Sequence, residues 1–155
     1  MKLEYLADHP ELLPTAAQWY FEEWGYLSEE KTLEQDIQRL QIYLNKDKVP
    51  LMLLAIEEGA LLGVAQLKFR EMSIYPEKEH WVGGVYVAET HRGKGIARQI
   101  LSELIAIAKL LKIETLYLQT EHLDGGLYGR MGWTPIEQVN YRGIEVLVME
   151  KYLKA

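Results

Sequence analysis

One segment of the sequence changes its periodicity within a few residues, and this change constrains the fold more than any other feature. Residues 80–88, HWVGGVYVA, read as a β-strand, whereas from Gly95 onward the apolar residues recur at helical spacing. A basic, glycine-rich loop, ETHRGKG, lies between them. A strand, a short loop and a helix with a wide apolar face predict a β-α unit in which the helix packs against a sheet.

The loop of this unit has the composition of an anion-binding site. A helix start leaves backbone N–H groups unpaired and adds partial positive charge, and glycines let a ligand approach the backbone closely. Arg92, Lys94 and Arg98 add formal charge, which favours a phosphate ligand. Neither the Walker A pattern nor the Rossmann pattern G-x-G-x-x-G is completed here, so neither nucleotide-binding motif supports the site. The alternative is an ordinary strand-to-helix loop with solubilising charges.

The remaining segments predict a mixed α/β fold. Apolar runs meet at Glu58-Gly59 and again at Arg142-Gly143, as in β-hairpins, and Gly83-Gly84 indicates a bulge in the strand before the loop. We expect a largely antiparallel, twisted sheet of six to seven strands with about four helices, in one domain spanning residues 1–155. The predicted elements are strands at 1–7, 80–88 and 113–120, hairpins at 50–72 and 134–153, and helices at 8–24, 28–45, 95–111 and, in short form, 124–133.

The starts of the first two helices are open to alternatives. Asp8 and Glu11 have capping-box spacing, but Pro14 is unfavourable inside a helix, so the regular helix begins either near Asp8 or at Pro14. The second helix begins at Ser28 or at Thr32.

The composition argues against several classes of protein. The chain has no cysteine, which excludes disulfides, zinc–thiolate sites and a cysteine acyl-enzyme, and its four histidines lack metal-ligand spacing, so no metal is expected. A net charge of −6 argues against nucleic-acid binding. No apolar run approaches the roughly 18 residues of a membrane span, and the acidic start is unlike a secretory signal. A cytoplasmic protein without a membrane partner is expected.

Two motifs together resemble the Gcn5-related N-acetyltransferase (GNAT) family. RGKGIA, Arg92 to Ala97, matches the family's Arg/Gln-x-x-Gly-x-Gly/Ala motif, and LYGRMGW, Leu127 to Trp133, is similar to its Leu-Tyr-x-x-x-Gly-Phe/Trp segment. The motifs stand in the family's order with a strand between them. The resemblance implies the GNAT fold and an enzyme that moves an acetyl group from acetyl-CoA to a primary amine, by direct attack in a ternary complex.

The resemblance also implies how acetyl-CoA binds as co-substrate. Loop amides from His91 or Arg92 through Ala97 are expected to hold its pyrophosphate, and the preceding strand to pair with its pantetheine arm. The N–H of Val85 or a neighbour is expected to polarise the thioester carbonyl. Tyr128 matches the tyrosine that protonates the departing thiolate, with packing alone as the alternative. The expected donor-binding residues are Val85, Tyr86, Val87, Arg92, Gly93, Lys94, Gly95, Ile96 and Ala97.

The sequence leaves the general base unresolved. Gln119 stands where some family members carry a glutamate, and the family's asparagine before the tyrosine is absent from QTEHLDGGLY. The candidates are Glu121, His122 or a bound water, with Glu79 and His80 as weaker ones. The absent glutamate also favours a second class of function, a catalytically silent acyl-CoA-binding sensor or interaction module.

The acceptor is expected to be cationic: a polyamine, a lysine side chain or a peptide N-terminus. Residues 18–30, QWYFEEWGYLSEE, mix aromatic and acidic side chains, and residues 1–40 hold nine acidic and three basic residues, which accounts for the whole net charge. A packed core with a solvated acidic face is the alternative. The terminal hairpin is expected to reach the acceptor, to join a second copy in a homodimer, or only to complete the sheet.

Overall fold

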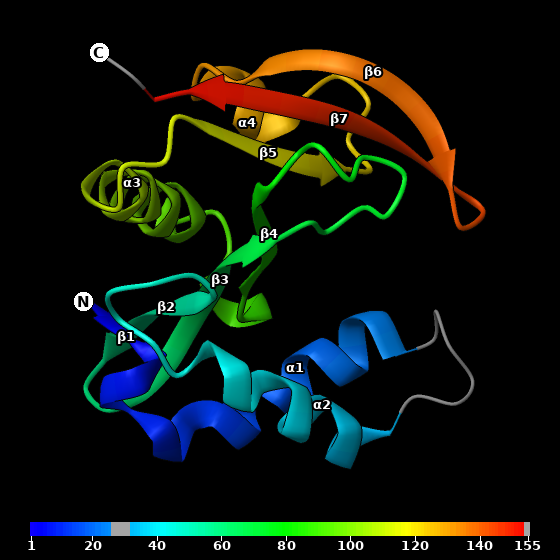
Figure 1. Cartoon of the computed structure of the whole chain (residues 1–155). Helices are drawn as coiled ribbons and strands as arrows, with labels where there is room; N and C mark the ends of the chain where they lie inside the picture. The colour runs from blue at the N-terminus through cyan, green and yellow to red at the C-terminus, as the bar shows by residue number, and fades with distance from the viewer. Residues whose placement is uncertain (26–31, 154–155) are drawn as a thin grey trace.

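The strands form one mixed sheet in the order β1-β2-β3-β4-β5-β7-β6 in the computed structural model, which describes residues 1–25 and 32–153 (Figure 1). Neighbouring strands are antiparallel except for β4 and β5, which are parallel. The predicted mixed, largely antiparallel sheet is therefore confirmed. The strands are β1 (Lys2–Tyr5), β2 (Leu51–Glu57), β3 (Ala60–Phe69), β4 (His80–Val87), β5 (Thr115–Thr120), β6 (Thr134–Tyr141) and β7 (Ile144–Tyr152).

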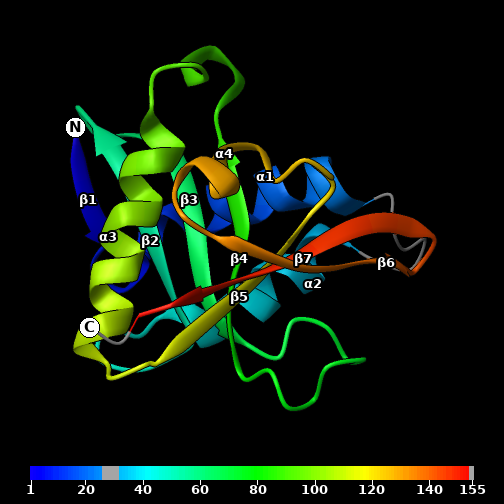
Figure 2. The same cartoon turned by 90° about the horizontal axis from the view of Figure 1, so that it is seen from above.

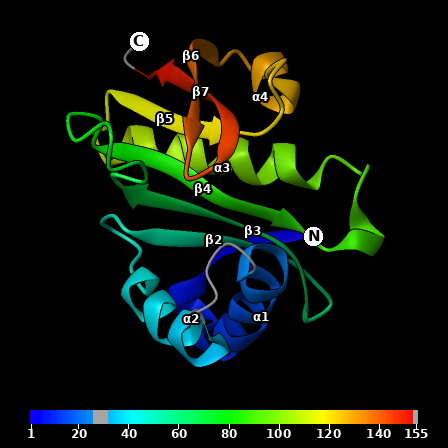
Figure 3. The same cartoon turned by 90° about the vertical axis from the view of Figure 1, so that its right-hand side faces the viewer.

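Helices cover both faces of the sheet. Figure 3 shows α1 (Leu13–Trp24) and α2 (Leu33–Leu40) on one side of β2 to β4 and α3 (Ile96–Leu110) on the other. The predicted stripe of α3 packs against the sheet with α4 (Gly126–Arg130) beside it, and each fully buried aliphatic side chain contributes about 1.5–3 kcal/mol. None of the described helices is long and apolar enough to cross a membrane. Short 3₁₀ turns complete the described elements: η1 (Leu6–Asp8), η2 (Pro10–Leu12), η4 (Gln41–Tyr43) and η5 (Glu89–His91).

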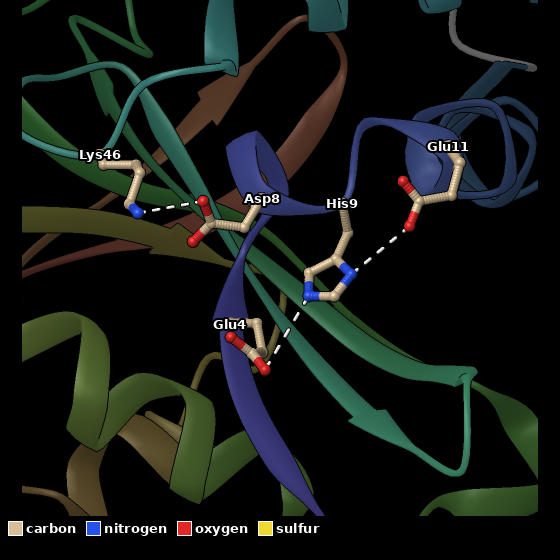
Figure 4. Close-up of polar contacts among 5 residues, drawn as sticks. All are labelled: Glu4, Asp8, His9, Glu11 and Lys46. Atoms are coloured by element: carbon tan, nitrogen blue, oxygen red, sulfur yellow. Dashed lines mark hydrogen bonds and ion pairs between the residues drawn. The ribbon is translucent and has the colours of Figure 1, made fainter.

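The first helix is shorter than the span 8–24, because the chain before Leu13 forms the turns η1 and η2 and Pro14 lies in the first turn of α1. The capping box expected of Asp8 and Glu11 does not form. Instead, Asp8 accepts a hydrogen bond from Lys46 Nζ at 3.0 Å, and Glu11 pairs with His9 Nδ1 at 3.4 Å (Figure 4).

The start of α2 follows one of the two predicted alternatives. Thr32 is its N-cap, and the Thr32 hydroxyl and the Gln35 side chain form a reciprocal capping box. Ser28, the other candidate start, lies outside the described residues.

Both predicted hairpins are confirmed. Glu58 and Gly59 have φ angles of 51° and 80°, and Arg142 and Gly143 have 54° and 86°. Two successive residues in the left-handed region are typical of the type I′ turns that join twisted antiparallel strands.

The predicted bulge lies in β4 opposite β3. Gln66 pairs with Gly83 and Val64 with Tyr86, so two residues of β4 oppose one residue of β3. Gly84, inside the bulge, has a φ of +56°. Beyond the bulge β4 diverges from its other neighbour: Trp81 and Tyr117 are the single β4–β5 pair among the described residues, and the two strands run in clearly different directions in Figure 2.

A loop at residues 70–79 closes a separate small core against the terminal hairpin. Met72 and Tyr75 from this loop pack with Trp81, Val146 and Val148. The Tyr75 hydroxyl donates to the Glu137 carboxylate, and Tyr141 contacts Ser73. Val82, Leu147 and Met149 face α3. Successive side chains of a strand point to opposite faces of the sheet, so the neighbouring Trp81, Val146 and Val148 lie on the other face, which α1 and α2 also cover.

Candidate active site

The loop between β4 and α3 presents a row of unpaired main-chain donors. The amide of His91 donates to Ala88 at 2.8 Å and that of Arg92 to Glu89 at 3.4 Å, which closes η5. The next five amides, Gly93 to Ala97, have no hydrogen-bond partner among the described residues. Gly93 and Gly95 have φ angles of 79° and 78°, and a Cβ on either would meet no atom within 4 Å. The loop therefore offers an open, positively polarised surface at the start of α3.

The basic side chains of the loop differ in their surroundings. Arg92 Nε donates to the carbonyl oxygen of Val87 at 2.9 Å, and its guanidinium lies 5.2 Å from the ring centre of Tyr86. Lys94 and Arg98 are exposed and form no ion pair with other described residues. Arg92 thus braces the loop against the end of β4, while Lys94 and Arg98 leave their charge available for an anion.

The end of β4 has a main-chain edge that no other strand covers, although the Val87 carbonyl oxygen accepts the hydrogen bond from Arg92 Nε. Ala88 donates to Leu62 of β3, and because pairs alternate along an antiparallel ladder, Val85 and Val87 direct their peptide groups away from β3. No strand pairs with this edge beyond Trp81 in the described chain. An extended ligand can therefore add to β4 as a strand would.

The side chains of this strand end alternate between the two faces of the sheet. Val85 and Val87 pack toward α3, whereas Tyr86 packs on Trp19 and Trp24 of α1, with ring centres 5.2 and 6.3 Å away. Ile96 is buried under the loop and Ala97 is half-buried. These contacts fix the strand end and the helix start relative to each other.

Tyr128 lies on α4, with its ring edge-on to Trp133. Burial, followed by the negative charge of Glu71, raises the pKa of Tyr128 to about 12. Its hydroxyl has no hydrogen-bond partner among the described residues. Tyr128 is therefore a neutral phenol at physiological pH, with a proton free to donate.

The general-base candidates predicted from the sequence differ in exposure and in their distance along the strands from the loop. Glu121 and His122 are exposed just after β5, and their side chains form no ion pair with the described residues. His80 lies at the start of β4, the far end from the loop, where burial lowers its pKa although Glu79 is 3.5 Å away. Glu79 and His80 line two shallow hollows there. Gln119 is half-buried on β5.

The structure adds one carboxylate that the sequence pattern did not single out. Glu71 follows β3, its side chain is only 17% exposed, and it pairs with Lys68 Nζ at 3.5 Å. Its Oε1 lies 2.6 Å from the point where a Cβ on Gly83 would be. Glu71 belongs to no motif, and the one hint in the sequence is the glycine on the neighbouring strand that leaves room for it.

The aromatic and acidic segment divides between core and surface. Tyr20 is buried and Trp19 and Trp24 are half-buried, whereas Glu22 and Glu23 are exposed. The packed-core alternative therefore holds for Tyr20. Tyr26, Glu29 and Glu30 lie outside the described residues.

A family match, a relative in sequence and similar solved structures all relate this chain to acetyltransferases. Residues 9–133 match the family described as "Acetyltransferase (GNAT) family". A stretch of 64 residues is 39% identical to the protein named "Uncharacterized N-acetyltransferase YobR" of Bacillus subtilis (strain 168); it covers 39% of this chain but only 26% of that protein.

Solved structures resemble the whole chain. A ribosomal-protein-alanine N-acetyltransferase from Brucella melitensis is 26% identical, with a TM-score of 0.74 over 99% of this chain and all of that one. An aminoglycoside 6'-N-acetyltransferase complexed with coenzyme A is 14% identical, with a TM-score of 0.78 over 100% of this chain and 98% of that one. The latter similarity shows the fold alone.

Proposed function

The chain belongs to the acetyltransferase (GNAT) family, and from this premise we propose that it transfers an acetyl group from acetyl-CoA to a primary amine. The observation that carries the proposal is the meeting of two features: the free main-chain edge of β4 and the unpaired amides of Gly93 to Ala97 that directly follow it. Together they suit a ligand with an extended amide-bearing arm and a diphosphate.

The residues present fit acetyl-CoA. The five open amides, the start of α3 and the charges of Lys94 and Arg98 suit its pyrophosphate. The peptide groups of Val85 and Val87 suit its pantetheine amides, and the N–H of Val85 or a neighbour would polarise the thioester carbonyl. When bound, acetyl-CoA supplies a reactive thioester; the protein supplies position, which accounts for most of the expected rate enhancement.

We assign to Tyr128 the role of proton donor to the departing thiolate. A phenol with a pKa of about 12 keeps its proton across the working pH range, and the unpartnered hydroxyl can donate it to the thiolate as the C–S bond breaks. The exposed Glu22 and Glu23 of α1 and the acidic excess of the first quarter of the sequence favour a cationic acceptor such as a polyamine, a lysine side chain or a peptide N-terminus.

A second candidate is a module that binds acyl-CoA without chemistry. Exposed Glu121 and His122 and the glutamine at position 119 favour it. Turnover separates the two candidates, because both bind the donor.

The test is a calorimetric titration with acetyl-CoA followed by an assay for free thiol with spermidine, Nα-acetyl-lysine and a tripeptide with a free N-terminus. We expect micromolar to sub-millimolar donor binding and thiol release with at least one amine. Absence of donor binding at millimolar concentration would contradict both candidates. Binding without release from any amine would favour the silent module.

A further inference from the structure

Polar groups gather in a strip between two apolar clusters on the sheet face covered by α1 and α2. On one side lies the core formed with α1 and α2, and on the other the core of the 70–79 loop and the terminal hairpin. The strip itself holds Gln66, Lys68, Glu71 and the hydroxyls of Tyr20 and Tyr43. We call it the polar strip. Burial raises the pKa of Tyr43, on which the charges of Lys68 and Glu71 also act.

Glu71 is held in place from several directions. The next residue, Met72, is fully buried, and the amide of Arg70 donates to the Glu79 carbonyl at 2.8 Å across the base of the loop. Lys68 approaches the carboxylate from β3. A carboxylate fixed in this way is unusual for a loop residue, since most of the loop glutamates that the structure describes are exposed.

The carboxylate of Glu71 occupies the space that a side chain on β4 would otherwise fill. A Cβ on Gly83 would come within 2.6 Å of Glu71 Oε1 and within 3.1 Å of Lys68 Cδ. Gly83 lies two residues beyond Trp81, where β4 and β5 have ceased to pair. Glu71 is therefore at the mouth of the opening between these strands.

Tyr128 lies on the opposite face of the sheet, in the cluster that packs with α3. Its neighbours Leu127 and Met131 pack with α3, whereas Glu71 belongs to the face of α1 and α2. The negative charge of Glu71 nevertheless contributes to the raised pKa of Tyr128, so the two groups lie within electrostatic reach of each other. Groups held between them would have a proton acceptor on one side and a proton donor on the other.

We propose that Glu71 binds the ammonium group of the acceptor and removes its proton, with the polar strip as the acceptor site. The proposal rests on the proposed acetyl transfer. Glu71 takes one proton from R–NH₃⁺, and the nitrogen lone pair that this frees forms a bond to the acetyl carbonyl carbon. The C–S bond breaks with its electron pair on sulfur, and Glu71 releases its proton to solvent after turnover. Tyr128 gives its proton to the sulfur and regains one from the nitrogen, which leaves R–NH–COCH₃ and CoA–SH.

Glu71 suits this role better than the candidates that the sequence indicated. Glu121 and His122 are exposed, and Glu79 and His80 lie at the start of β4, the end far from the loop. Glu71 alone among these five combines a shielded carboxylate with a place beside the opening.

The test compares Glu71→Gln with a matched control, Glu121→Gln, using the full chain and the best amine of the panel. We expect Glu71→Gln to lower kcat/KM about 100-fold or more, as for loss of a general base, while acetyl-CoA affinity stays within about twofold. Glu121→Gln is expected to change kcat/KM less than about threefold. Glu71→Asp, which keeps the charge, should recover at least about tenfold over Glu71→Gln and guards against misfolding of the amide variant.

A further variant, Lys68→Met, separates the carboxylate from its ion pair. It should cost about tenfold at most; a loss equal to that of Glu71→Gln would assign the effect to the ion pair and overturn the proposal. Retention of a third or more of wild-type kcat/KM by Glu71→Gln would overturn the role of Glu71 and leave acetyl transfer standing. A wild type that binds acetyl-CoA but acetylates no amine would overturn both.

Discussion

The hydroxyl of Tyr20 on α1 donates a hydrogen bond to the carbonyl oxygen of Gly84 in the β4 bulge, at 2.6 Å. This bond ties the helix to the point where β4 parts from β5. Tyr20 is buried, and burial raises its pKa well above the usual value, so the hydroxyl remains a donor throughout the physiological range.

Tyr20→Phe should therefore destabilise the fold and loosen the bulge. A buried carbonyl left without its donor costs about 1–3 kcal/mol, and urea unfolding should report a loss of this size. Tyr5→Phe is the control, because the Tyr5 hydroxyl has no hydrogen-bond partner among the described residues. Equal stability of the two variants would contradict a structural role for the bond.

Gly84→Ala should destabilise more than Gly59→Ala, although both glycines have positive φ angles. The left-handed conformation costs about 1–2 kcal/mol at each position. At Gly84 the added Cβ would also lie 2.8 Å from Gln66 Cδ and Tyr20 Oη, whereas at Gly59 it would meet nothing within 4 Å. We expect overpacking to add about 1–3 kcal/mol at Gly84 alone, measured by thermal and urea unfolding.

Gly83→Ala is expected to affect activity more than stability. The φ angle of Gly83 is ordinary, and the atom that a Cβ would strike is the far end of the Glu71 side chain. That side chain can move away, so unfolding free energy should fall by less than about 1.5 kcal/mol. Displacement of the carboxylate should lower kcat/KM at least about tenfold. Full activity in Gly83→Ala would show that the position of Glu71 does not matter.

Tyr128→Phe should change both turnover and the alkaline stability of the fold. Loss of the proton donor is expected to lower kcat about tenfold or more with little change in donor affinity. Because the folded-state pKa is raised to about 12 from 10, the native state holds this proton between pH 10 and 12 when the unfolded chain has lost it. Wild type should therefore lose stability over that window, by up to about 1.4 kcal/mol per pH unit more than Tyr128→Phe.

Unfolding by urea at pH 9, 10 and 11 measures the second effect. The unfolding free energies of wild type and Tyr128→Phe should change with pH in the same way below pH 10, and that of wild type should fall more steeply above it. An equal change of unfolding free energy in the two proteins between pH 10 and 11 would contradict the raised pKa.

Much of the fold could be predicted because its signals are local. The stripe of α3, the turns at Glu58-Gly59 and Arg142-Gly143 and the paired glycines of β4 each lie within one short stretch of sequence. The start of α1 was harder to predict, since the capping-box spacing of Asp8 and Glu11 suggested an earlier start, whereas residues 6–12 form two short turns and Pro14 lies in the first turn of α1.

Glu71 could not be found in this way. Its position depends on the docking of the 70–79 loop against β7 and on a missing side chain at Gly83. Both are contacts between segments far apart in the sequence, and neither alters the local pattern around residue 71. The exposed Glu121 and His122 show the converse: proximity to a motif along the chain did not bring them into a shielded place.

The single main-chain pair between β4 and β5 has a mechanical consequence. The strands β1 to β4 form one ribbon and β5, β7 and β6 another, and side-chain packing rather than a backbone ladder joins them. Contacts of α3 and of the 70–79 loop hold the two ribbons together. The distance between β4 and β5 beyond their single pair can then change by small shifts in side-chain packing, without loss of any strand, as a ligand binds and leaves.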